Sequence, residues 1–180
     1  MSIYQTGDAL PRPLYYQAEA FSRIVFDDDE EYDIDLGLTE PAVHITVAQG
    51  NLLIAYAAVS WTDLEHAGVQ YRCYGLSTVL TFPAFRRRGY GGQMVQAAIT
   101  LITQAADADI ALLWTTPNNI DWYTRYGWRA LPALTTLVGD PAAPEVDDEE
   151  TAMMLFISEK GRAGEPAFEQ GRVYVGEERW

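Results

Sequence analysis

The segment that most constrains the fold is residues 78–102, which contain a strand, a glycine-rich turn and a helix in direct succession. Residues 79–82 form a short apolar run that Pro83 ends, as a strand would end. From Met94 onward, apolar residues recur every three or four positions, which is the spacing of one face of an α-helix. The segment therefore predicts a strand–turn–helix unit in the middle of the chain.

The loop of this unit, residues 86–92, has three adjacent arginines followed by three glycines and a tyrosine. Glycines allow tight turns and bring backbone N–H groups close to a ligand, and the start of a helix adds unpaired N–H groups and a positive dipole end. The whole chain has 12 Lys and Arg against 26 Asp and Glu, and adjacent cations repel unless an anion joins them. A plain basic surface loop is the alternative, but the clustering favours a pyrophosphate site.

The order Arg86-x-x-Gly89-x-Gly91 after a strand resembles the (Q/R)xxGx(G/A) signature of the GNAT acyl-CoA N-acetyltransferases. Residues 120–128, IDWYTRYGW, resemble the second landmark of that family, of the form FYxxxGF. The loop lacks the Gly-Lys-Ser/Thr of a Walker motif and the GxGxxG of a dinucleotide fold. On these two landmarks the chain is identified as a member of the GNAT superfamily.

The resemblance implies an α/β (α+β) fold with a mixed, mostly antiparallel sheet, helices on both faces, and strands splayed at an acetyl-CoA site. A length of 180 residues predicts one domain over residues 1–180, with 159–180 as a C-terminal tail. Dimers are frequent in the families that the chain resembles. Acetyl-CoA is the implied co-substrate. Its expected binding residues are Val79, Leu80, Thr81, Arg86, Arg87, Arg88, Gly89, Tyr90, Gly91, Gly92, Asn118, Asn119 and Tyr123.

Tyr123 matches the tyrosine that this family places near the CoA sulfur, so we expect it to act as general acid toward the leaving thiolate. A packed core tyrosine is the alternative role, and Tyr126 is a second candidate acid. The base is open, with Asp33, Asp35 and Glu65 as candidates. The two histidines are expected to be structural.

Composition limits the partners of the protein. A net charge of −14 argues against nucleic acid or an anionic membrane and is compatible with a cationic substrate. A single cysteine excludes an intrachain disulfide, and no Cys/His cluster predicts a metal site. The first residues lack the layout of a signal peptide, and no apolar run reaches the roughly 18 residues that cross a bilayer. We therefore expect a cytoplasmic enzyme without a metal.

The rest of the chain divides into short elements. The expected helices are 14–26, the helix after the glycine loop, and 120–126, ended by Gly127. The expected strands are 43–47, 52–61, 69–80, 109–116, 128–138 (interrupted by Pro132) and 153–158, with a loop near 63–68 and a polar excursion at 141–150. The 109–116 strand should run parallel to the strand before the glycine loop, because a helix connects them.

A narrower resemblance concerns the acceptor. Residues 71–73, 52–59 and 123–128, the acidic stretch 147–150 and the end of the chain look like the aminoglycoside 2′-N-acetyltransferases. In that family a terminal Trp carboxylate and acidic side chains bind the polycationic drug. Asp148, Glu178 and the Trp180 carboxylate would match these roles here, Asp33 or Asp35 would match the acidic N-terminal loop, and Ser77 is a further expected acceptor contact.

Ser77 stands where that family has a glutamate proposed as base through water, and a serine cannot be a carboxylate base. The Trp180 carboxylate or a water chain would have to act instead, so Trp180 joins Tyr123 as a candidate catalytic residue. Three readings stay open: an N-acetyltransferase for a small cationic primary amine, one for aminoglycosides in particular, and an acyl-CoA-binding regulatory module without turnover.

Overall fold

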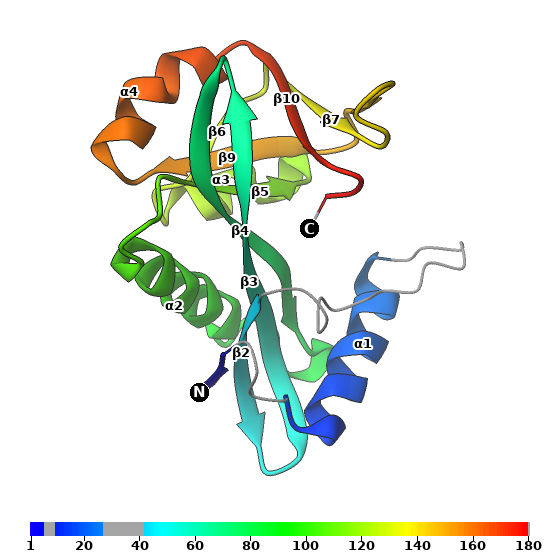
Figure 1. Cartoon of the computed structure of the whole chain (residues 1–180). Helices are drawn as coiled ribbons and strands as arrows, with labels where there is room; N and C mark the ends of the chain where they lie inside the picture. The colour runs from blue at the N-terminus through cyan, green and yellow to red at the C-terminus, as the bar shows by residue number, and fades with distance from the viewer. Residues whose placement is uncertain (6–9, 27–41, 180) are drawn as a thin grey trace. The chain divides into compact units, whose positions relative to one another are not determined.

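The computed structural model describes residues 1–5, 10–26 and 42–179, and the chain falls into two compact units (Figure 1). Unit 1 comprises residues 1–60 and 76–101, and unit 2 comprises residues 61–75 and 102–180. Three elements contribute residues to both units: the strands β3 (Leu52–His66) and β4 (Val69–Thr81) and the helix α2 (Tyr90–Gln104).

Unit 1 is a sheet with a helix on either side. Its strand order is β1 (Ser2–Tyr4), β2 (Ala42–Gln49), β3 and β4, and both β1 and β3 run antiparallel to β2. Figure 1 shows α1 (Arg12–Phe26) and α2 on opposite sides of β2 and β3. Residues 53–59 of β3 are buried without alternation, as expected of a strand covered on both faces.

The side of this sheet that faces α1 has its own hydrophobic core. It consists of Leu10, Leu14, Ala18, Leu53, Tyr56, Ala58 and Leu80, with Tyr4, Tyr15 and Phe21 packed against it. Gln17 of α1 ties the helix to the β2–β3 turn, because its side-chain oxygen accepts the Leu53 N–H at 3.0 Å and its amide donates to the Asn51 carbonyl at 2.7 Å.

Unit 2 has two sheets. In the first, β3 and β4 are followed by β5 (Ile110–Thr115), β9 (Thr151–Phe156) and β6 (Arg129–Ala130). The second is β10 (Gly171–Gly176), β7 (Leu134–Val138) and β8 (Glu145–Asp147), with β10 parallel to β7. The helices of unit 2 are α3 (Ile120–Thr124), α4 (Glu159–Phe168) and the 3-10 turn η2 (Pro117–Asn119), whereas the 3-10 turn η1 (Pro83–Phe85) belongs to unit 1.

The pairing of β4 with β5 is parallel, as the connecting helix predicted. It covers three residue pairs, from Cys73–Ile110 to Gly75–Leu112, although β5 continues to Thr115 along β9. The pairs of β5 and of β6 with β9 are antiparallel. The predicted fold class, a mixed α/β structure with a mostly antiparallel sheet, is confirmed.

Three expected elements differ from the structure. The loop predicted near 63–68 is the end of β3, whose exposed Asp63 and Glu65 alternate with buried Leu64 and His66 before a turn at residues 67–68. The strand predicted over 128–138 is two strands, β6 and β7, separated around Pro132. Residues 159–168, expected to be part of a tail, form α4.

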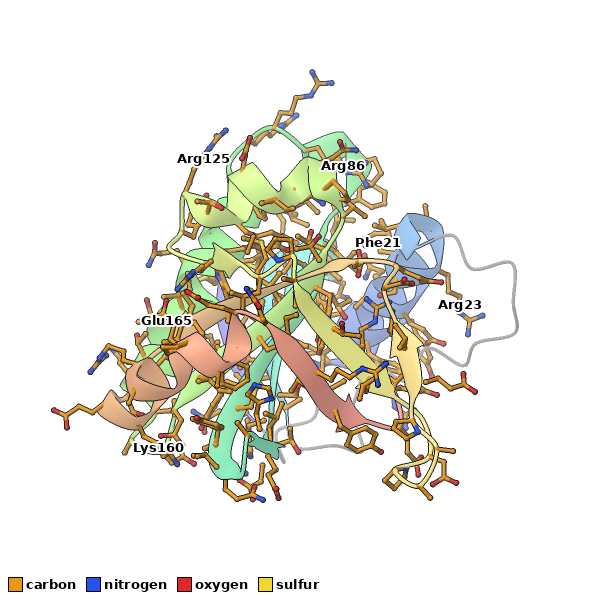
Figure 2. The ribbon with its side chains drawn as sticks, turned by 90° about the horizontal axis from the view of Figure 1, so that it is seen from above. Phe21, Arg23, Arg86, Arg125, Lys160 and Glu165 are labelled. Atoms are coloured by element: carbon orange, nitrogen blue, oxygen red, sulfur yellow. The ribbon has the colours of Figure 1, made fainter. Side chains whose placement is uncertain are left out.

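Helix α4 begins at Ser158, whose hydroxyl accepts the Gly161 N–H at 2.9 Å. Lys160 and Glu165 both project from this helix (Figure 2). A side chain at Gly161 would overlap the Asp109 carbonyl, and one at Gly164 would overlap the Tyr71 hydroxyl. The two glycines thus allow α4 to pack closely against Asp109 and Tyr71. Among the described residues, no helix is long and apolar enough to cross a membrane.

Candidate functional site

The arginine–glycine loop, residues 86–92, follows β4 and η1 in unit 1. Arg87 and Gly89 have positive φ angles of 60° and 84°, so the backbone reverses direction there. The Arg86 Nε donates to the Thr81 carbonyl at 3.1 Å, and the Arg88 guanidinium lies 5.5 Å from the Phe85 ring centroid. Residues 86–89 are exposed, and Figure 2 marks Arg86 at this loop.

Helix α2 begins within the loop, at Tyr90. Its first closing bond runs from the Gln93 N–H to the Gly89 carbonyl at 3.1 Å, so the N–H groups of Tyr90, Gly91 and Gly92 have no acceptor within the helix. The first turn carries no acidic residue. Unpaired N–H groups, a positive dipole end and three arginines together suit a pyrophosphate, so the residues present fit the phosphate end of acetyl-CoA.

The strand before the loop contains a backbone irregularity. Thr78 has φ 52°, which is rare for a β-branched residue because its side chain crowds the backbone. It separates half-buried Ser77 from Val79, Leu80 and Thr81, the residues expected to pair with the pantetheine arm. Thr78 was not among the predicted site residues, since no sequence pattern marks a positive φ at threonine.

Tyr123, the expected general acid, lies on α3 in unit 2 and is only 8% exposed. Its ring contacts Trp122 edge to face, with centroids 4.7 Å apart. Burial, and then the negative charge of Glu150, raise the pKa of Tyr123 to about 12, so the hydroxyl is protonated at neutral pH but is a weaker acid than an exposed tyrosine. A protonated, largely buried hydroxyl is suited to donate a proton to a thiolate.

Asn118 and Asn119 form η2 at the end of β5, and both side chains are exposed. The Asn119 amide donates to the Thr116 hydroxyl at 3.4 Å. Their exposure leaves them free to meet a ligand, and their roles as pantetheine contacts remain predictions.

The acidic segment, residues 147–150, is held by an arginine that sequence reasoning did not single out. Arg179 Nε lies 2.5 Å from Asp147 Oδ2, and its terminal nitrogens lie 3.1 Å from Glu150 Oε2 and 3.7 Å from Glu149 Oε2. The guanidinium also lies 5.8 Å from the ring centroid of Trp114. Asp148 and Glu178, the expected substrate carboxylates, are exposed, and within the described ranges neither has an ion pair.

Both histidines are packed into the structure. His44 Nδ1 lies 2.8 Å from the Tyr56 hydroxyl, and burial lowers the pKa of His44. His66 Nε2 lies 2.8 Å from the Ala167 carbonyl, and its ring stacks on Phe168 at 4.2 Å. Glu65 is exposed and accepts a hydrogen bond from Gln70. In the described part of the chain, no group of three or more metal-ligating side chains is assembled.

The predicted site residues are thus divided by the structure. The expected pyrophosphate and pantetheine residues of β4 and the loop lie together in unit 1. Ser77, an expected acceptor contact, also lies in unit 1. Unit 2 holds the expected acid Tyr123, the expected pantetheine contacts Asn118 and Asn119, and the expected acceptor carboxylates Asp148 and Glu178. Asp33, Asp35 and Trp180 fall outside the described residues.

Comparison with known proteins adds independent information. The model of the acetyltransferase (GNAT) domain matches residues 14–131. A search of curated proteins gives no match by sequence. Among solved structures, the GNAT family N-acetyltransferase YhbS from Escherichia coli in complex with CoA has a TM-score of 0.64 at 15% identity, covering 97% of this chain and 88% of that chain.

Two further structures share the fold. A GNAT family acetyltransferase from Brucella melitensis in complex with acetyl-CoA has a TM-score of 0.60 at 17% identity, with 97% and 94% of the two chains covered. NAA60 from Arabidopsis thaliana in complex with a bisubstrate analogue has a TM-score of 0.62 at 14% identity, covering 87% and 98%. These comparisons do not support the narrower resemblance to aminoglycoside 2′-N-acetyltransferases. The domain match over residues 14–131 shows that this chain belongs to the GNAT family of acetyltransferases.

Proposed function

We propose that the protein transfers acetyl from acetyl-CoA directly to the primary amine of a small cationic molecule. The observation that carries the proposal is the arginine–glycine loop. It combines two positive φ angles, the unpaired N–H groups at the start of α2 and three adjacent arginines in an otherwise acidic chain. The CoA and acetyl-CoA complexes of proteins with the same fold support acyl-CoA as the co-substrate.

The chemistry assigns one task to each group. The amine nitrogen attacks the thioester carbonyl carbon, the C–N bond forms, and the C–S bond breaks. The ammonium first loses one proton to a base or to water. Tyr123 then donates its phenolic proton to the departing thiolate, and the second proton that the nitrogen loses after attack restores the Tyr123 hydroxyl through water. A backbone N–H near Leu80 would polarise the carbonyl oxygen. Asn118 and Asn119 would hold the pantetheine arm.

The cationic nature of the acceptor is supported by charge. A net charge of −14 attracts cations, and the exposed Asp148 and Glu178 provide carboxylates without a partner among the described residues. We propose Asp33, Asp35, Ser77 and the Trp180 carboxylate as further acceptor contacts, with Trp180 also a candidate base.

The test is acetyl-CoA turnover, measured as free thiol, against aminoglycosides, polyamines, arylamines and peptide N-termini. Turnover that prefers polyamines or other small cations is expected. A preference for aminoglycosides would identify the narrower substrate class, and a preference for neutral amines would overturn the cationic acceptor. Tight acetyl-CoA binding without turnover on any amine would overturn the enzyme assignment in favour of a binding module.

A further inference from the structure

We propose that Arg179 is a positioning residue: it clamps the C-terminal segment onto the acidic segment and compensates the charge of Glu150, on which proton donation by Tyr123 depends. The clamp stands on geometry alone. Its kinetic consequence rests on the proposed acid role of Tyr123. The partners of Arg179 named above all lie within unit 2.

The guanidinium of Arg179 is partly enclosed by its partners. Its side chain is 20% exposed and that of Asp147 is 15% exposed, whereas Glu149 is 84% exposed and adds little. Asp147 and Glu150 therefore bind Arg179 from the two ends of the acidic segment. A planar guanidinium can contact two carboxylates at once, which a lysine ammonium cannot do with the same geometry.

The guanidinium of Arg179 also packs against the ring of Trp114. The indole Nε1 of Trp114 donates to the Thr136 hydroxyl at 2.9 Å, which fixes the ring between β5 and β7. The guanidinium lies over the ring face at 5.8 Å, a distance at which the cation is attracted by the π system. Arg179 is thus held by charge from one side and by an oriented ring from another.

The link to chemistry runs through Glu150. Burial first, and then the negative charge of Glu150, raise the pKa of Tyr123, because a negative charge disfavours loss of the phenolic proton. Arg179 lies 3.1 Å from the same carboxylate and partly offsets its field. Without Arg179 the Tyr123 hydroxyl becomes a weaker acid, so protonation of the thiolate slows.

The kinetic test compares Arg179→Gln, Glu150→Gln and the double variant. Arg179→Gln should lower kcat about threefold to tenfold, the change that follows from about one pKa unit in a general acid, and should leave the KM for acetyl-CoA unchanged. Adding Glu150→Gln should restore most of the lost rate, because the uncompensated charge is gone. Arg172→Gln, an exposed arginine on β10, is the matched control and should leave kcat unchanged.

Equal loss of rate in Arg179→Gln and in the double variant would overturn the electrostatic part of the proposal. If Arg179→Gln does not fold, Arg179→Lys decides instead. Arg179→Lys keeps the positive charge but cannot contact two carboxylates with the same geometry. Its kcat should fall less than that of a neutral variant at this position that folds, for which Arg179→Met is available. A lysine variant as slow as the neutral one would likewise overturn charge compensation.

A second readout does not depend on activity. Acrylamide quenching of Trp114, taken as the difference from a Trp114→Phe background, should increase about twofold in Arg179→Gln as the guanidinium leaves the ring. Unchanged quenching would overturn the clamp. If Tyr123→Phe leaves kcat intact, the acid role fails, yet the quenching result still decides whether the clamp exists.

Discussion

The arginine–glycine loop and the acidic segment are both strongly charged, but they hold their charges in different ways. The loop arginines are exposed, and what suits the loop to a ligand is backbone: two positive φ angles and the unpaired N–H groups that begin α2. The acidic segment is set by side chains, since Asp147 and Glu150 are bound by Arg179. A backbone site is expected to fail through changes at glycine, and a side-chain site through loss of a single functional group.

The largest expected effect breaks the backbone site. Gly91→Asp should weaken CoA binding by about 10³-fold, because it places a carboxylate beside the N–H groups that would bind pyrophosphate. Helix α2 should remain stable, since an acidic residue in a first turn interacts favourably with the helix dipole. Isothermal titration with CoA measures the change.

The matched control is Gly50→Asp, in the β2–β3 turn of the same unit, where φ is 60° and the space beside Cα is open. Any loss of stability there should leave CoA affinity unchanged. If Gly91→Asp also binds CoA normally, the arginine–glycine loop is not the pyrophosphate site.

The next largest expected effect tests the proposed role of Tyr123 as general acid. Tyr123→Phe should lower kcat by about 10²-fold with little change in acetyl-CoA affinity, because it removes only the proton donor. Steady-state kinetics with the best amine of the panel measures it. Tyr126→Phe is the comparison variant, since Tyr126 packs on the same Trp122 ring at 5.5 Å. A loss confined to Tyr126→Phe would transfer the acid role to that residue.

The same difference between the regions explains what the sequence could predict. The turn before α2 was predicted because three adjacent arginines followed by closely spaced glycines are an uncommon combination. Its role as a pyrophosphate site stays a prediction. The parallel pairing of β4 with β5 followed from the helix between them. Backbone requirements of this kind leave a direct mark on residue choice.

Features that depend on contacts between residues distant in sequence could not be predicted from a local sequence pattern. Helix α4 was missed because Gly161, Gly164 and Pro166 weaken a helical pattern, and the helix depends on close packing against Asp109 and Tyr71. Arg179 was missed because its partners are about thirty residues earlier in the chain. Thr78 was missed because its positive φ opposes the preference of threonine, which only the surrounding structure can override.

A buried carboxylate in unit 2 gives the third effect. Asp109 accepts hydrogen bonds from the Arg72 N–H at 2.9 Å and the Ser158 hydroxyl at 2.7 Å, and it pairs with Lys160 at 2.5 Å. Asp109→Asn should lower the free energy of unfolding by about 2 kcal/mol, measured by urea denaturation. Asp63→Asn, whose side chain is 75% exposed, should cost less than about 0.5 kcal/mol.

The pH dependence of this effect has a definite sign. Burial alone would raise the pKa of Asp109, but the hydrogen bonds from Lys160, Ser158 and the Arg72 N–H outweigh it and lower that pKa below the usual 3.8. Between the lowered pKa of the folded state and the usual pKa of the unfolded state, the folded protein therefore binds fewer protons than the unfolded protein. The stabilisation by Asp109 is complete when the pH is above the usual pKa of an aspartate, and it is lost as the pH falls through the lowered pKa of the folded state. The stability difference between wild type and Asp109→Asn should accordingly shrink below about pH 4, and a constant difference would contradict the ion pair.

The smallest effect returns to the backbone site, at Thr78. Its φ of 52° is costly for a β-branched residue, by about 1–3 kcal/mol, whereas glycine adopts this angle readily. Glycine also gains freedom in the unfolded chain, worth about 1 kcal/mol against the folded state. Thr78→Gly should therefore leave the free energy of unfolding unchanged or raise it by up to about 2 kcal/mol.

Thr81→Gly is the matched variant, because Thr81 lies in the same strand without a positive φ. It relieves no strain and should lose about 1 kcal/mol in urea denaturation. If Thr78→Gly loses as much as Thr81→Gly, the backbone at Thr78 is not strained. The contrast between a backbone-held loop and a side-chain-held acidic segment would then rest on residues 86–92 alone, since β4 would approach the loop as an ordinary strand.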